Sequence, residues 1–377
     1  MLNPTMPLLD LITDTDLPPS AIDDATRHIG DVLRDAIQHT PTQTALLITD
    51  SRCGLARALG AAYQRCLPNA RVMDFDTVSA EQIQAAFTVL SPGDLVVLVQ
   101  SSNFRLDAYR IRVELFKLQL KVIEHPHLAR MPGQQALHYI AALAYDAHYY
   151  RSIGHALKAR IDQAYSAVVD SGGAQLHFGA LESAKLNIGD YTGMTNIGGQ
   201  FPIGEVFTEA RDLATVNGQV RIFVFGDTTF SVNRPVHPIT LVVSHGKVVD
   251  VIDSTPAFDQ VLANIRADEG EVLLRELGFG MNRAFSKDRT VDDIGTFERM
   301  CGIHLSLGAK HGVYNKPGFK RGVVRHHVDV FVDTHQVWLD DVSVYRDGMW
   351  CVTMPAHCAA AAGAQTMRSP QEVSASV

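Results

Sequence analysis

A histidine and an aspartate two residues apart are the sharpest chemical signal in this sequence. They are His327 and Asp329, in the run RHHVDVFVD. If 324–332 forms a strand, both side chains share one face and the alternating valines take the other. An imidazole beside a carboxylate is a chelating pair for a divalent metal ion, although a polar, half-exposed strand gives the same letters. His326 points with the valines in this arrangement and is the less expected ligand.

Two further residues could complete a metal site. His304, in GIHLSLG, shares a strand face with Ser306 and Gly308, which leave room for an ion and a substrate. Its alternative is a core histidine that a hydrogen bond satisfies. Glu205, in PIGEVFTEA, is followed by an apolar Val-Phe pair that would face inward. A buried carboxylate needs a partner, which is either a metal ion or an arginine or lysine.

Glu276 lies in LLRELGFGMN, a run that we interpret as the end of a helix closed by a Gly-x-Gly turn. The helix dipole disfavours an acid at that end, so a compensating cation is expected. The alternative is a solvated acid balanced by Arg275. Two glutamates, two histidines and one aspartate make an oxygen and nitrogen ligand set that Zn²⁺, Mn²⁺, Co²⁺ and Fe²⁺ all accept. The carboxylates suffice for one or two ions.

The first part of the chain alternates strands and helices. Strands are predicted at 45–50, 71–76, 94–102 and 120–126, with helices between them; the helix at 79–90 begins with a Ser-x-x-Gln capping box. A long helical pattern covers about 135 to 166. This order predicts an α/β domain over 1–165 with a doubly wound parallel sheet.

After residue 166 short strands separated by Gly, Asn and Asp turns predict a mainly antiparallel β domain of α+β type over 166–358, which carries the metal ligands. SHGKVVD is a hairpin signal, and one helix is expected from about 256 to 277. The small polar residues of 359–377 predict a disordered tail.

Composition limits the classes of partner and location. The formal net charge of −8 argues against nucleic acid, because phosphate binding favours a basic surface. The five cysteines form no CxxC pair, the N-terminal apolar run lacks the positive residues typical of a signal peptide, and no uncharged apolar run approaches the length of a membrane span. We therefore expect a cytoplasmic protein that binds neither nucleic acid nor membrane. No glycine-rich phosphate-binding motif is present.

The segment SSNFRLDAYRIR follows the third predicted strand of the first domain. Ligands of open α/β sheets favour this carboxyl end, so Ser101, Ser102 and Asn103 could touch one; a polar turn with a helix cap gives the same residues. Arg105, Arg110 and Arg112 could reach a substrate carboxylate, although basic residues on a helix usually face solvent.

Four motifs in order resemble the metal-dependent aminopeptidases typified by aminopeptidase T and aminopeptidase S. They are GEVFT, ELGFGMN, FERMCGIHLSLG and HVDVFVD, and the resemblance covers about 160 to 345. It implies a pair of divalent metals held by Glu205, Glu276, His304, His327 and Asp329, with Glu298 as the rival of Glu276. It also implies a homodimer that removes N-terminal residues from small peptides.

The resemblance further implies that a metal-activated water attacks the peptide carbonyl while a nearby acid or base moves a proton. We expect His311, Tyr314 and Glu298 to be the catalytic residues. The family has a tyrosine seven residues after the strand histidine, and this sequence has His311 there instead, with Tyr314 three residues later. His311 could still donate a hydrogen bond to an oxyanion.

The sequence also resembles a chemically different group of enzymes with the same scaffold, the 2,5-dihydroxypyridine dioxygenases. These use one Fe²⁺ ion held by two histidines and an aspartate, and His304, His327 and Asp329 would supply that triad here. The retained Glu205 and Glu276 favour two metals instead. A non-catalytic protein that keeps the fold is the third hypothesis.

Overall fold

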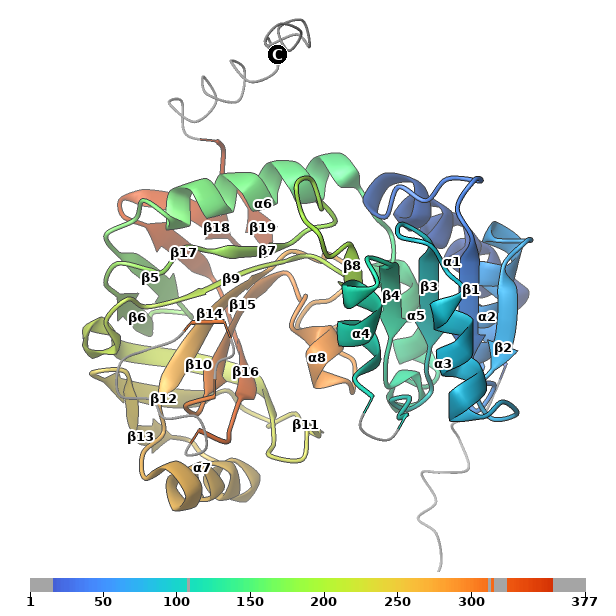
Figure 1. The fold of residues 1–377 in the computed structure, drawn as a ribbon. Helices are drawn as coiled ribbons and strands as arrows, with labels where there is room; N and C mark the ends of the chain where they lie inside the picture. The colour runs from blue at the N-terminus through green and yellow to red at the C-terminus, as the bar shows by residue number, and fades with distance from the viewer. Residues whose placement is uncertain (1–15, 107–108, 311–312, 315–323, 355–377) are drawn as a thin grey trace, which may run out of the picture.

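The computed structural model describes residues 16–106, 109–310, 313–314 and 324–354. Two β-sheets organise this part of the chain (Figure 1). The fold is mixed α/β, with a parallel sheet in the first half and a large antiparallel sheet in the second, as the sequence predicts. The predicted tail at 359–377 lies outside the described residues.

The parallel sheet has five strands in the order β2-β1-β3-β4-β8. Its strands are β1 (Ala45–Thr49), β2 (Arg71–Asp74), β3 (Leu95–Val99), β4 (Lys121–His125) and β8 (Gly198–Gln200). The first four coincide with the predicted runs. The fifth comes from the second half of the chain and pairs in parallel with β4.

Helices cover both faces of this sheet, because alternate strand residues enter two separate apolar cores. Leu47 and Val97 pack with α1, α2 and α5 on one face, whereas Leu46 and Val96 pack with α3 and α4 on the other. The helices are α1 (Pro19–Asp31), α2 (Gly54–Cys66), α3 (Ala80–Thr88), α4 (Ile111–Lys117) and α5 (Gln134–Ala142). The sheet is therefore doubly wound, and the predicted capping box of α3 is present between Ser79 and Gln82.

The long helical pattern over 135–166 is divided between two helices. The chain forms α5 and then α6 (Ala147–Ile161). Asp146 interrupts the pattern because its carboxylate accepts a hydrogen bond from the backbone N–H of Tyr149 and caps a new helix.

The antiparallel sheet follows the order β19-β18-β17-β5-β6-β10-β16-β15-β14-β9-β7, and β11, β12 and β13 extend it from β10. Its strands are β5 (Ala167–Asp170), β6 (Gln175–Phe178), β7 (Lys185–Asn187), β9 (Glu205–Glu209), β10 (Asn217–Gly226), β11 (Val232–Asn233), β12 (Ile239–Ser244), β13 (Lys247–Ile252), β14 (Leu274–Gly280), β15 (Gly302–Leu307), β16 (Val328–Val332), β17 (Gln336–Leu339), β18 (Val342–Arg346) and β19 (Met349–Trp350). The predicted hairpin is β12–β13.

Among the described residues of this half, two segments form α-helices, α7 (Pro256–Glu269) and α8 (Ile294–Phe297). In Figure 1, α8 lies on the side of the antiparallel sheet that faces the parallel sheet. No helix in the described ranges is both long and apolar enough to cross a bilayer.

Candidate metal centre

Four neighbouring strands of the antiparallel sheet carry the predicted ligands. Glu205 begins β9, Glu276 lies in β14 and His304 lies in β15. Asp329 lies in β16, and His327 directly precedes that strand. The strands pair in the order β9-β14-β15-β16, so residues that are up to 124 positions apart meet on one surface.

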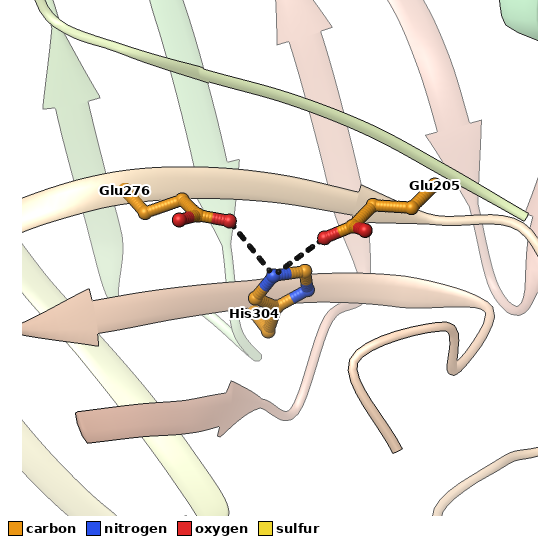
Figure 2. Close-up of side chains that lie close together, drawn as sticks. All are labelled: Glu205, Glu276 and His304. Atoms are coloured by element: carbon orange, nitrogen blue, oxygen red, sulfur yellow. Dashed lines mark hydrogen bonds and ion pairs between the residues drawn. The ribbon is translucent and has the colours of Figure 1, made fainter. Parts of the chain in front are cut away.

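Glu205, Glu276 and His304 form a first group of donor atoms (Figure 2). The Nε2 atom of His304 lies 3.3 Å from Glu205 Oε1 and 3.4 Å from Glu276 Oε1. All three residues are buried. One imidazole nitrogen therefore faces two carboxylates, while the Nδ1 atom of the same ring is buried and makes no hydrogen bond with the described residues.

Glu298, His327 and Asp329 form a second group. His327 Nε2 lies 3.1 Å from Asp329 Oδ1, as the two-residue spacing predicts. His327 Nδ1 lies 3.0 Å from the carbonyl oxygen of Lys310, so it carries the proton that it donates to this oxygen. This contact fixes the tautomer that leaves Nε2 as the ligand atom.

Glu276 joins the two groups. Its Oε1 atom faces His304, and its Oε2 atom lies 3.8 Å from His327 Nε2. The side chains of Glu298 and His327 keep 22% and 30% of their exposure, against 1% for His304. A substrate would therefore reach the six residues from the side of the second group.

Each of the two imidazole rings has a nitrogen atom that faces carboxylates, and the pKa values of both histidines reflect this. Burial alone would lower the pKa of His304, but Glu205 and Glu276 outweigh it and raise that pKa well above its ordinary value. Burial also opposes protonation of His327, yet Asp329 and Glu276 raise its pKa to about 10. Each site thus attracts a positive charge, which a proton or a metal ion can supply.

The two acids of the second group differ. Burial and the charge of Asp329 raise the pKa of Glu298 well above its ordinary value, so Glu298 can hold a proton. Burial opposes ionisation of Asp329 as well, but His327 lowers its pKa. Two neighbouring carboxyl groups whose pKa values differ in this way can take different roles, one as a proton carrier and the other as a permanent anion.

Arg299 is a functional candidate that the sequence patterns do not indicate. Its buried guanidinium lies 3.3 Å from Glu205 and forms a shorter ion pair with Glu298, and its Nη1 atom also donates to the carbonyl of Gly295. The arginine thus contacts one carboxylate of each group. Its only sequence signal is its place next to Glu298 in FERM, which does not indicate burial.

The donor atoms suit a divalent ion. Ligand atoms about 2.1 Å from a tetrahedral ion lie about 3.4 Å apart, close to the two contacts of His304. A direct hydrogen bond between charged partners would be shorter, about 2.8 Å. The oxygen and nitrogen set without thiolate is compatible with Zn²⁺, Mn²⁺, Co²⁺ or Fe²⁺.

Three local expectations are wrong. Glu276 is not near a helix end, because α7 stops at Glu269 and 274–280 is strand β14. The alternative interpretation of Glu276 as a solvated acid is wrong, because Glu276 is buried; Arg275 forms an ion pair with Glu209, at 2.8 Å. The strand around the His-x-Asp pair begins at Val328 rather than 324, which leaves His327 just outside the ladder.

Of the three residues predicted to be catalytic, the structure describes Tyr314 and Glu298. Tyr314 donates its single hydroxyl hydrogen to the carbonyl of Ser183, 2.6 Å away. His311 lies outside the described residues. Glu298, the predicted rival of Glu276, lies in the second group, so the structure places both acids among the candidate ligands.

No protein-family model and no curated protein matches the chain. Two solved structures share its fold. One is a 2,5-dihydroxypyridine dioxygenase from Pseudomonas putida KT2440, with a TM-score of 0.58 and 16% identity over 89% of this chain and 98% of that one. The other is wild-type AmpT from Thermus thermophilus, with a TM-score of 0.54 and 14% identity over 88% of this chain and 99% of that one. The likeness to both groups named above is thus a likeness of fold.

Proposed function

We propose that this chain is a metal-dependent hydrolase that removes N-terminal residues from small peptides. The observation that carries the proposal is the bridge through Glu276, whose two oxygen atoms face one histidine of each group. A carboxylate shared between two neighbouring ligand groups suits a pair of metal ions held close together. The AmpT fold neighbour is consistent with it.

Glu205, Glu276 and His304 would hold one ion, and Glu276, His327 and Asp329 the other. Such ions polarise a carbonyl and lower the pKa of water, so that hydroxide is available near neutral pH. Glu298 is the proposed general acid, because its raised pKa lets it keep a proton for the departing amine. Arg299 would orient Glu298 by donating a hydrogen bond to its carboxyl group.

The dioxygenase remains the alternative function, since one fold neighbour has that activity. Its triad would combine His304 with His327 and Asp329, but the donor atoms that converge with His304 are those of Glu205 and Glu276. This arrangement favours the hydrolase. A non-catalytic member of the fold would not need six converging donors.

Metal content and turnover, measured on the same preparation, test the proposal. We expect two zinc, cobalt or manganese ions per chain by elemental analysis, and release of N-terminal residues from dipeptides. Glu205→Ala and His327→Ala should each abolish turnover while the fold survives, and Glu114→Gln, at a partly exposed residue of α4, should change neither. One iron per chain with oxygen consumption on 2,5-dihydroxypyridine would favour the dioxygenase. Absence of bound metal, even after metal addition, would contradict both enzymes.

A further inference from the structure

A second polar site lies in the first half of the chain. A cavity of about 370 Å³ opens beside the carboxyl ends of β3 and β4, and Gln200 at the end of β8 also lines it. None of the six residues of the metal centre lines this cavity. The volume is in the range of small-molecule sites, and the carboxyl ends of parallel strands are where open α/β sheets bind ligands.

The walls of this cavity are basic. Arg105, Arg110 and Arg112 line it, and Glu124 is the only acid among its described lining residues. Glu124 is already paired with Arg112, at 2.8 Å. Arg105 and Arg110 are exposed and form no ion pair within the described part of the chain. Two guanidinium groups that no described acid pairs with thus share one cavity in a chain whose net charge is −8.

Buried residues anchor the segment that carries these arginines. Phe104 is buried and stacks on Phe75, with ring centroids 3.9 Å apart, and its backbone N–H donates to the Gln100 side chain. Leu106 is buried and bridges to Tyr109. Arg105 lies between two buried neighbours and therefore points outward. Residues 107–108 lie outside the described residues and are not part of the site.

We propose that this cavity binds a small anion through a carboxylate or phosphate group, with Arg105 and Arg110 as its principal donors. The planar guanidinium offers paired N–H groups that match the two oxygens of such an anion. Asn103 and Gln200 line the same cavity and add neutral donors. The site is separate from the metal centre and does not depend on the proposed hydrolase function.

Isothermal titration with inorganic phosphate and with succinate tests this site. We expect the full chain to bind at least one of them with a millimolar dissociation constant, and Arg105→Gln/Arg110→Gln to weaken that binding at least ~10-fold. The tighter probe identifies the preferred anion class. Arg112 is left intact because its loss would release Glu124.

The matched control is Arg71→Gln/Arg346→Gln, which removes the same charge at two exposed arginines on β2 and β18. It should bind as the unchanged chain does. Equal weakening by both double variants would reduce the effect to net charge and overturn the proposal. Binding that survives Arg105→Gln/Arg110→Gln also overturns it; phosphate that binds at the metal centre would survive in this way. The absence of binding by the unchanged chain overturns the proposal as well.

Discussion

The imidazole of His304 lies directly over Gly278, the residue opposite it on the neighbouring strand. A Cβ atom at Gly278 would come within 2.0 Å of His304 Cε1 and 2.1 Å of Nε2. The missing side chain at this position is therefore the space in which the histidine ring faces Glu205 and Glu276.

Gly278→Ala should displace the His304 ring and weaken metal binding roughly 10- to 100-fold, the range seen when the support of a metal ligand is lost. Competition of the purified variant against a metal indicator dye measures this affinity. Gly30→Ala is the control, because a Cβ atom there meets nothing within 4 Å. Unchanged affinity in Gly278→Ala would show that the ring position does not matter for metal binding.

Glu276→Gln keeps the shape of the bridging side chain but removes its charge. Because Glu276 faces both histidines, we expect the substitution to affect both metal sites rather than one alone. The variant should therefore lose at least one of two bound ions per chain. Elemental analysis after dialysis against a metal buffer gives the stoichiometry. Two ions retained at unchanged affinity would argue against the bridge.

Arg299→Met should destabilise the metal-free chain by about 3–5 kcal/mol, the usual cost of removing one partner from buried ion pairs. The variant leaves Glu205 and Glu298 without their shared cation, and divalent metal should restore part of the loss. Urea unfolding with and without metal measures both effects. A loss that metal does not reduce would indicate that Arg299 acts only on packing.

His125 predicts an acid-dependent loss of stability. It is fully buried between the hydroxyls of Tyr63 and Tyr139, and burial lowers its pKa to about 3. Below the ordinary value near 6.5 the unfolded chain binds a proton that the folded chain refuses. Stability should therefore fall by up to about 1.4 kcal/mol per pH unit between 6.5 and 3.

The variant His125→Gln isolates this contribution. It should be less stable than the unchanged chain at pH 7 and should lose less stability on acidification to pH 3.5, because glutamine does not titrate. Denaturant unfolding across this pH range measures the difference. Parallel pH curves for the two proteins would rule out the histidine as the source.

The parts of the fold that sequence predicts well are those in which local pattern and final environment agree. β3 is an unbroken apolar run and is buried throughout. His327 and Asp329 come together because a two-residue spacing keeps side chains on one face, even when the first residue lies just outside the ladder.

Glu276 shows where local pattern fails. The letters VLLREL continue the helical spacing of α7, but Gly270 ends that helix with a φ of +84°. The next segment is buried along its whole length between β9 and β15, so it lacks the alternation that marks a half-exposed strand. Arg299 could not be found either, because one of its partners, Glu205, comes from a distant strand.

The pairing of β8 with β4 has a consequence for biosynthesis. The edge of β4 acquires its neighbour only when Gly198–Gln200 have left the ribosome, well after the other four strands of the parallel sheet and their helices. Until then the nascent chain presents an open strand edge, the kind of surface that invites pairing with another chain. Premature termination between residues 166 and 197 should therefore give an aggregation-prone fragment, even though that fragment contains all the helices of the first half.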